Sequence, residues 1–592
     1  MIKLKALFFT GIILLNSAYS SAQNCTQYKS FADDWVATDA LGRTLPEFYQ
    51  TGGLCEGKIV GVFYYIWQGY HGNRVLDITK ILDQYPQTPL SNKNPGWGNI
   101  GEFHFWGEPE QGYYRSNDPW VIRRDLQMLS NANVDFIFFD VTNGYTYLET
   151  VITLCEISLQ MRNDGIATPQ ITFITNSSSA KVVQELYDKF YSINRFTELW
   201  FQWEGKPLIM CDFNDSTLRS EVKEFFTMKY SWAWTNTEKE ANHWQWLDKY
   251  PQNWGWSKSP AIPEQISVSA AHHPQNPLGN SFNQDNQPSV NEKYLTGSTG
   301  HGLQFAEQWD RALNIDPEVI MITQWNEWIA QRCIWENGNS QYAGRPIQNG
   351  DSWFVDVFTE EFNRDIAPMK DGHTDNLYYQ MISNIRKFKG MNKPQPVSTP
   401  KKIVIDGLFS EWDDVSPAFW DPSGDAMHRN FPGYDTTTVM INNSGRNDII
   451  ESRVNVNDDT IYFMVKTKKD LTPNTDSSWM YLLLDTDRSK STGWEGYDYL
   501  VNHEVLSSHE TTLKQWNGTE WTNPVKISYS FQGSSLELSI SAKSIGFITG
   551  EPEIYFKWAD NTGSLENISD FFIQGDAAPD RRFNFYFGKS LY

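Results

Sequence analysis

Short apolar runs alternate with amphipathic stretches over the first two thirds of the chain, and this alternation predicts strands that are each followed by a helix. The runs are of strand length and are bounded by polar or turn residues, as expected of parallel strands buried on both faces. Repeated βα units over roughly 350 residues predict an α/β fold of the (β/α)8 TIM-barrel type. The runs predicted as strands are 58–66, 134–140, 170–175, 207–212, 228–234, 265–270 and 319–327, and no eighth run stands out.

The last third of the chain has a different pattern. Short alternating runs such as 461–466 and 536–541 are separated by Asn, Asp, Gly and Ser, which is typical of an all-β sandwich. A segment with three prolines, 390–400, follows an amphipathic stretch at 375–389 and predicts a linker. The predicted domains are therefore a barrel domain over residues 23–390, a linker over 391–401 and a β-sandwich over 402–592.

Residues 1–22 have the pattern of a secretory signal peptide. Lys3 and Lys5 precede an apolar core at 6–15, and small residues lead to a cleavage position after Ala22. The apolar core is too short to span a membrane, and no later segment reaches the required length. The sequence thus predicts an exported protein, secreted or periplasmic, without a membrane span.

Composition narrows the class of partner. The formal charge is −23 and Lys and Arg are not clustered, so a phosphate-binding surface and a nucleic-acid partner are not expected. Aromatic residues make up 15% of the chain and include 25 Trp, an excess that suits stacking on sugar rings. The five Cys residues lack metal-ligand spacing, and no cofactor is predicted for catalysis.

The strongest candidate for chemistry is the end of the run 319–327, where Glu327 stands between Trp325 and Trp328. Residues at the C-terminal end of a barrel strand face the barrel mouth, where side chains do chemistry. Flanking aromatic faces stack on sugars, and partial burial tunes a carboxyl group for proton transfer. A surface Glu at a strand end is the ordinary alternative.

Other predicted strands also end in polar residues, which a barrel gathers over one pocket. Because glycoside hydrolysis requires two carboxyl groups, Glu327 and Asp140 are the predicted catalytic pair, with Asp212 as the alternative for the second role. Residues predicted to bind substrate come from strand ends and from the long loop after the first strand. They are Tyr65, Trp67, His104, Trp106, Asn143, His273, Trp325 and Asn326. For the loop residues and the two histidines, a purely structural role is the alternative.

Three segments resemble the glycoside hydrolase family 71 and 99-like superfamily. They are FYYIWQG at 63–69, the block from EFHFWGEPE to FIFFD at 102–140, and ITQWNEW at 322–328. The resemblance implies a (β/α)8 enzyme that acts on α-linked glycans, in a group that includes endo-α-mannosidases. It covers residues of about 58 to 390 and leaves the last third unaccounted for.

One position departs from the family pattern. The resemblance implies a second catalytic Glu three residues after the first, but this chain has Ala330 there. Only Glu327 and its neighbour Asn326 therefore carry over. Either another carboxylate, such as Asp140 or Asp212, supplies the second function, or the protein binds a glycan without cleaving it.

The last third resembles a family 9-like carbohydrate-binding module, on residues 403–412 and 484–501. Asp485, Asp487 and Asp498 surround a Gly-containing turn, and three such oxygen donors predict a structural calcium site, with an ordinary Asp-rich turn as the alternative. The whole sequence predicts an exported glycoside hydrolase that acts on a poly- or oligosaccharide. A non-catalytic glycan-binding protein on the same scaffold is the alternative.

Overall fold

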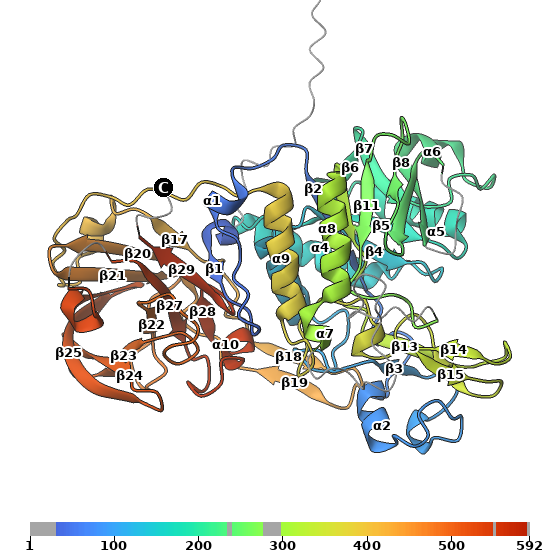
Figure 1. Ribbon diagram of the computed structural model, residues 1–592. Helices are drawn as coiled ribbons and strands as arrows, with labels where there is room; N and C mark the ends of the chain where they lie inside the picture. Colours follow the sequence, from blue (N-terminus) through green and yellow to red (C-terminus); the bar gives the residue numbers. More distant parts are fainter. Residues whose placement is uncertain (1–30, 234–239, 276–297, 549–551, 589–592) are drawn as a thin grey trace, which may run out of the picture.

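The computed structural model describes residues 31–233, 240–275, 298–548 and 552–588 (Figure 1). The predicted signal peptide lies outside these residues. None of the described helices is long and apolar enough to cross a membrane. The chain forms a mixed α/β part around a nearly closed sheet and a second part of antiparallel strands.

Among the described residues, eight strands of the first sheet run parallel, in the order β11, β12, β2, β4, β5, β7, β8 and β9. Their bounds are β2 Ile59–Tyr64, β4 Phe136–Val141, β5 Gln170–Thr175, β7 Lys206–Met210, β8 Thr227–Ala233, β9 His243–Leu247, β11 Gln265–Val268 and β12 Val319–Ile322. Two short strands, β6 (Gln202–Trp203) and β10 (Trp254–Gly255), pair antiparallel with β7 and β11. All of the parallel strands except β9 correspond to predicted runs.

A side chain joins the two ends of this sheet. Gln265 on β11 accepts a hydrogen bond from the backbone N–H of Gln245 on β9 (3.1 Å) and donates from Nε2 to the Gln245 carbonyl (2.9 Å). Both residues are fully buried, so the amide satisfies backbone groups that no neighbouring strand pairs. The sheet is therefore a nearly closed barrel.

Helices follow most of the parallel strands. The longer ones are α3 Pro119–Asn131, α4 Leu148–Asn163, α5 Ser179–Leu186, α8 Leu303–Ile315 and α9 Asn376–Lys389; the short ones are α1 Phe48–Thr51, α2 Ile78–Gln84, α6 Ser220–Phe225, α7 Ser298–His301 and α10 Asp570–Ile573. Asp118 caps α3 by accepting a hydrogen bond from the Trp120 N–H (3.0 Å). The stretch 248–264 between β9 and β11, described throughout, forms β10 and no helix. The predicted (β/α)8 barrel is thus supported only as a mixed α/β fold with a nearly closed sheet.

A small antiparallel sheet lies beside the carboxyl ends of the barrel strands. Its order is β16 (Ser352–Phe354), β13 (Ile329–Ile334) and β3 (Phe103–Phe105). The hairpin of β14 (Ser340–Tyr342) and β15 (Arg345–Ile347) lies next to it (Figure 1). This sheet forms part of the wall around the candidate site.

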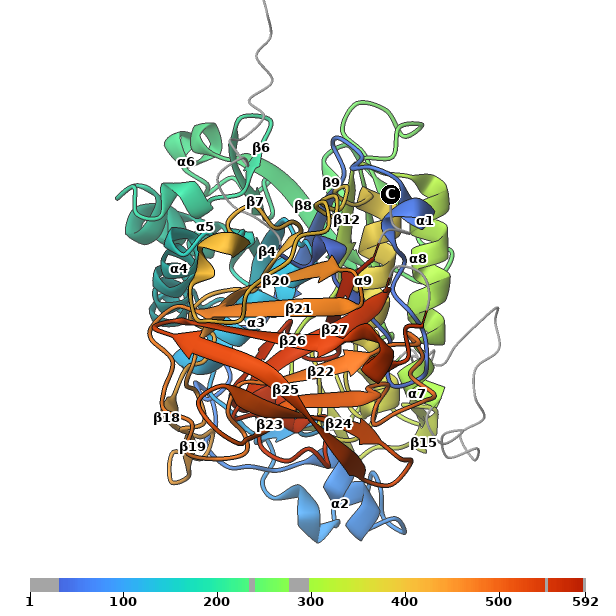
Figure 2. The same ribbon diagram turned by 90° about the vertical axis from the view of Figure 1, so that its left-hand side faces the viewer.

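The second part is a large antiparallel sheet, to which twelve strands of the described chain belong (Figure 2). The alternating sequence pattern predicts such an all-β part. Its strands are β1 Val36–Ala37, β17 Ala418–Trp420, β20 Ile449–Asn457, β21 Thr460–Thr467, β22 Tyr481–Asp485, β23 Tyr499–Val505, β24 Glu510–Trp516, β25 Trp521–Gln532, β26 Ser535–Ser541, β27 Ile554–Asp560, β28 Asp576–Ala578 and β29 Phe583–Phe587; a separate hairpin pairs β18 Arg429–Pro432 with β19 Val439–Asn442. The sheet folds over its own core, because Phe556 on β27 packs against Phe419 on β17 and Phe463 on β21 at 5.0 and 5.6 Å between ring centroids.

The two parts are joined by strand pairing and by buried ion pairs. Strand β1, near the start of the described chain, pairs with β29 and so belongs to the antiparallel sheet. Arg581 forms two hydrogen bonds to the carboxylate of Glu110 (2.6 and 2.7 Å), and Arg429 lies 2.7 Å from the carboxylate of Asp118. The antiparallel part therefore contacts the loop after β3 and the start of α3 directly.

Candidate active site

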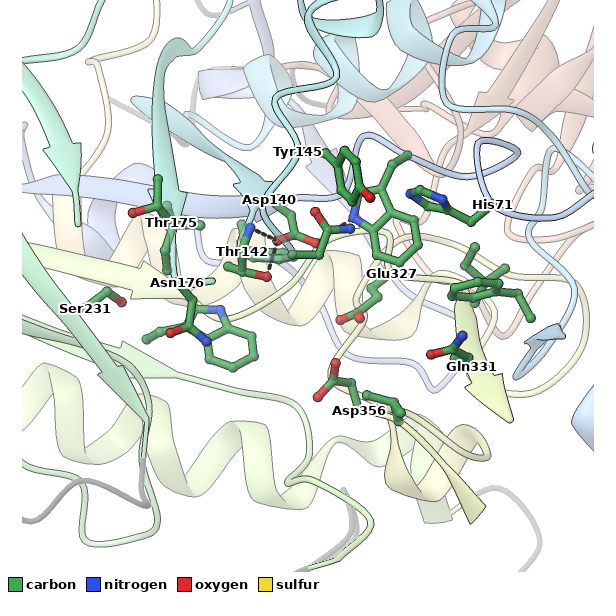
Figure 3. A pocket seen from close by; sticks show the side chains of 18 of the residues that line it. His71, Asp140, Thr142, Tyr145, Thr175, Asn176, Ser231, Glu327, Gln331 and Asp356 are labelled. Carbon is green, nitrogen blue, oxygen red and sulfur yellow. Dashed lines mark hydrogen bonds between the residues drawn. The ribbon is translucent and has the colours of Figure 1, made fainter. Parts of the chain in front are cut away.

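A cavity of about 780 Å³ lies at the carboxyl ends of the barrel strands, between them and the small sheet (Figure 3). Its carboxyl groups come from Asp140 at the end of β4, Glu327 beyond β12 and Asp356 beyond β16. The other lining residues that matter to the site are Trp67, His71, Phe103, Asn143, Tyr145, Asn176, Tyr230, Trp246 and Gln331. The cavity thus combines several acids with aromatic walls.

Glu327 is held rigidly at the bottom of this cavity. Its backbone N–H donates to Asp365 Oδ1 (2.7 Å), and its Oε2 lies 3.5 Å from Nη2 of the buried Arg364. The neighbouring Asn326 accepts from the Tyr65 N–H (2.8 Å) and so ties the end of β12 to the end of β2. Glu327 is only 6% exposed, yet it lines the cavity.

Asp356 stands opposite Glu327, and Figure 3 shows the two carboxyl groups turned toward each other. Its backbone has a φ of 69°, in the left-handed region that a residue with a Cβ rarely adopts. One carboxylate oxygen lies 3.3 Å from Nε2 of His273, and the side chain is 43% exposed to the cavity. The strained backbone directs a solvent-accessible carboxylate at Glu327.

The charges around this pair do not balance. The charge of Glu327 interacts with three other carboxyl groups, those of Asp140, Asp356 and Asp365, and with the guanidinium of Arg364. The Nη2 atom of Arg364 lies 3.5 Å from Glu327 and has no hydrogen-bond partner among the described residues, so one arginine offsets little of this negative charge, which favours protonated carboxyl groups.

The pKa values of the two facing acids are shifted in opposite directions. Burial, together with the charge of Asp356, raises the pKa of Glu327 well above its ordinary value and outweighs the effect of Arg364. The walls of the cavity desolvate Asp356 and alone would raise its pKa, but the hydrogen bond from His273 and the charge of Arg364 lower it below the ordinary value. The environment of the pair therefore favours the protonated form of Glu327 and the ionised form of Asp356.

Asp140 is fixed by three hydrogen bonds. Its Oδ2 accepts from Trp67 Nε1 (2.8 Å), and its Oδ1 accepts from the N–H and the hydroxyl of Thr142 (3.0 and 2.7 Å). Burial nevertheless raises the pKa of Asp140, against the effect of these donors. Asp140 thus holds Trp67 in the cavity wall and is the third carboxyl group that lines the cavity.

Groups that suit sugar hydroxyls lie beside this wall. Trp67 is stacked with Tyr147 at 6.0 Å between ring centroids, and the Tyr147 hydroxyl contacts His71 Nε2 (2.7 Å) and Asn143 Nδ2 (2.5 Å). The Asn143 Oδ1 atom is buried without a hydrogen-bond partner within the described structure. An aromatic face beside an unsatisfied amide oxygen and an imidazole matches a pyranose ring and its hydroxyls.

The structure brings together only some of the residues predicted from the sequence. Glu327, Asp140, Trp67 and Asn143 line the cavity, whereas Asp212 is not among the lining residues. The remaining predicted residues lie behind the wall: Tyr65, His104, Trp106, His273, Trp325 and Asn326. Their roles in substrate binding stay predictions without a direct cavity contact.

Two of the loop residues have structural partners instead. Both ring nitrogens of His104 lie within hydrogen-bond distance of backbone carbonyls, those of Glu102 (3.1 Å) and Trp97 (2.8 Å). Trp106 is fully buried, donates to Asp365 (2.8 Å) and stacks on Trp328 at 4.7 Å. Both support the loop and the position of Glu327 from behind.

Sequence reasoning missed several residues of the cavity, among them Asp356, Trp246 and His71. Asp356 follows a short strand of the small sheet, so it lacks the apolar run that marks a barrel strand end. Trp246 lies on β9, the strand that was not predicted, and His71 lies past the predicted strand-end positions. Only the alternating aromatics of the HWQWL segment at 243–247 could have signalled β9.

The acidic turn in the antiparallel part does gather its three aspartates. One carboxylate oxygen from each of Asp485, Asp487 and Asp498 lies within 4.8 Å of the others. Hydrogen bonds from the turn already engage them, such as those from the Arg488 N–H to Asp485 (2.5 Å) and from the Thr486 N–H to Asp498 (2.9 Å). The arrangement suits both a cation and a self-contained turn, so calcium binding here stays a prediction.

No protein-family model matches the chain, and no curated protein matches it. Among solved structures, the GH99 endo-α-mannosidase from Bacteroides thetaiotaomicron in complex with BIS-TRIS-propane is similar at 15% identity and a TM-score of 0.32, covering 56% of this chain and 97% of that chain. A second structure of the GH99 endo-α-mannosidase from the same organism gives a TM-score of 0.31 with the same identity and coverage. Similarity at this level assigns neither residues nor a substrate to this chain.

Proposed function

We propose that this protein is a glycoside hydrolase that cleaves a poly- or oligosaccharide in the cavity at the carboxyl ends of the barrel strands. The observation that carries the proposal is the facing pair of Glu327 and Asp356, with pKa values shifted in opposite directions, inside an aromatic-walled cavity. Glycoside hydrolysis needs such a pair, one carboxyl group to protonate the leaving oxygen and one to act as nucleophile or base.

Glu327 is the general acid in this proposal, because burial raises its pKa and favours its protonated form. Asp356 is the ionised partner, because it is exposed to the cavity and lies beside His273 and Arg364. Asp140, predicted from the sequence as the second catalytic acid, is the alternative for this role, since it also lines the cavity. Its three hydrogen bonds favour a role in positioning Trp67.

The cavity favours an uncharged glycan. None of the described residues that line it is Lys or Arg, whereas three are carboxylic acids. A uronic acid, sulfate or phosphate group on the sugar would be repelled by this field and would find no bidentate donor. Neutral hexose units, stacked on Trp67 and Trp246, are therefore the proposed substrate.

The non-catalytic alternative rests on Ala330, the position where the family pattern has its second Glu. Ile329 and Gln331 on β13 line the cavity, while Ala330 between them is 1% exposed and pairs with His104. Successive residues of a strand point to opposite faces, so a carboxylate at position 330 would point away from the cavity. Ala330 is thus compatible with catalysis by another acid.

Incubation of the protein with a panel of neutral and acidic oligosaccharides tests the proposal. We expect release of reducing ends from at least one neutral glycan and none from uronate-containing or sulfated ones, because of the charge in the cavity. Calorimetric titration of the same panel supplies the comparison. Saturable binding of a glycan that is never cleaved would instead favour the glycan-binding alternative.

The shifts in pKa predict a bell-shaped dependence of kcat/KM on pH. Asp356 must be ionised, so activity falls as the pH drops through a pKa below the ordinary 3.8. Glu327 must be protonated, so activity also falls as the pH rises through a pKa well above the ordinary 4.5. Initial rates from the lowest pH at which the protein stays folded up to pH 9 follow this dependence; a rate that keeps rising through pH 8 would contradict the assignment of Glu327 as the acid.

The proposal extends to the rest of the chain on sequence evidence. The signal-peptide pattern at 1–22 supports export, secreted or periplasmic, and the resemblance at 403–412 and 484–501 supports a carbohydrate-binding role for the antiparallel part. The Asp485 turn is proposed as a structural calcium site of that part. No cofactor is required by the two-carboxylate mechanism.

A further inference from the structure

Three aspartates gather at the junction between the antiparallel sheet and helix α3. Asp421 follows β17, Asp425 lies in the same loop and Asp576 begins β28, and one carboxylate oxygen from each lies within 4.8 Å of the others. Asp425 also accepts a hydrogen bond from the side chain of Gln127 on α3 (2.9 Å). We call these three aspartates the junction cluster, because they join distant segments where the two parts of the molecule meet.

The unsatisfied oxygens of Asp421 point to a ligand. Asp421 is 3% exposed, and neither of its carboxylate oxygens has a hydrogen-bond partner among the residues that the structure describes. The Oδ1 atom of Asp425 is buried in the same way without a partner. A carboxylate buried without a donor or a counter-ion is strongly unfavourable, so these oxygens require a proton or a cation.

The nearby basic side chains of Lys557 and Arg123 act on the cluster through their charge, but their hydrogen bonds go to backbone carbonyls. Lys557 Nζ donates to the carbonyl of Pro579, and Arg123 Nη2 donates to the carbonyl of Ser423 (2.6 Å). Asp580 adds a further negative charge beside the junction cluster. The protein's own cations therefore leave the group with an excess of carboxylate oxygens that face one another.

We propose that Asp421, Asp425 and Asp576 bind a calcium ion, which stabilises the contact between the antiparallel sheet and α3. Within the described structure the group contains only carboxylate donors, and calcium accepts several such oxygens in an irregular arrangement. Zinc prefers nitrogen and sulfur ligands, and magnesium demands near-octahedral geometry and retains its waters. This site is separate from the turn at Asp485 that the sequence predicts.

The experiment uses the full-length protein, stripped with EDTA and titrated with calcium chloride by calorimetry, beside variants Asp421→Asn and Asp487→Asn. Because Asp487 belongs only to the other turn, the D487N protein is expected to bind one calcium ion at the junction cluster. The D421N protein is expected to bind one calcium ion fewer than the wild type. Absence of calcium binding by D487N would overturn the proposal, whether or not D421N folds.

Thermal denaturation gives a second readout. Calcium at millimolar concentration is expected to raise the Tm of the stripped D487N protein by at least a few degrees, because an ion that binds only the folded state stabilises it. Magnesium at the same concentration is expected to have a smaller effect. Without metal, D421N should be at least as stable as the wild type, since the substitution removes a repelled charge, and its Tm should respond less to calcium than that of the wild type. An equal calcium response in D421N and the wild type would contradict the assignment.

Discussion

Replacement of Glu327 with Gln is expected to lower kcat/KM on a cleaved glycan by about 10³-fold, because the amide cannot donate the proton that the leaving oxygen needs. Gln retains the size and the buried position of the side chain, so the loss reports the missing proton. The alkaline limb of the pH profile should disappear with the activity. Initial rates of the purified variant, with folding checked by circular dichroism, measure the effect.

Substitution of the partner acids identifies the second carboxylate. Asp356→Asn is expected to cause a loss similar to that of Glu327→Gln, because the ionised group that attacks or activates water is removed. Asp140→Asn should cost less, since Asn still accepts hydrogen bonds from Thr142 and disturbs mainly the contact to Trp67. Asp212→Asn is expected to retain wild-type rates, because Asp212 does not line the cavity.

The reverse order of effects would reassign the roles. A D356N protein that keeps full activity while D140N loses it would make Asp140 the second catalytic acid, as the sequence alone predicts. Full activity of the Glu327→Gln variant would remove Glu327 from catalysis and leave the facing pair without a function.

The strands of the barrel could be predicted because burial on both faces selects continuous apolar runs. The run at 170–175 coincides with β5, and the run at 319–327 contains β12 and ends at Glu327. Strand β9 was not predicted, because its buried positions include His243 and Gln245, which alternate with Trp and do not form an apolar run. Closure of the sheet depends on hydrogen bonds from the side chain of Gln265 to the backbone of Gln245, and no pattern of residue types predicts such a contact.

The site was less predictable than the fold for two physical reasons. Within β3 the side chains alternate, so Phe103 faces the cavity while His104, chosen for its chemistry, packs between backbone carbonyls on the other side. Asp356 reaches the cavity from a loop of the small sheet through a left-handed backbone conformation, which depends on tertiary packing. Residue type and strand position therefore pointed to Glu327, which lines the cavity, but not to Asp356, which faces it.

Replacement of Arg581 with Met is expected to destabilise the folded protein by about 3–5 kcal/mol. Arg581 is 2% exposed, forms two hydrogen bonds to Glu110 and lies 4.6 Å from the ring centroid of Phe572. Loss of the guanidinium leaves the carboxylate of Glu110 buried without its partner, at the contact between the antiparallel part and the loop after β3. Urea denaturation of the variant and the wild type measures the difference in free energy of unfolding.

A second substitution separates the unpaired charge from the lost packing. Adding Glu110→Gln to the Arg581→Met variant should restore part of the stability, because the neutral amide no longer needs a counter-ion. Arg195→Met is the matched control, since Arg195 pairs with Glu156 at 3.3 Å where both side chains are about half exposed, and solvent screening limits its cost to about 1 kcal/mol or less. If Arg581→Met proved no more destabilising than Arg195→Met, the Arg581–Glu110 ion pair would not hold the two parts together, and their association would rest on other contacts, such as the Arg429–Asp118 pair and the strand pairing of β1 with β29.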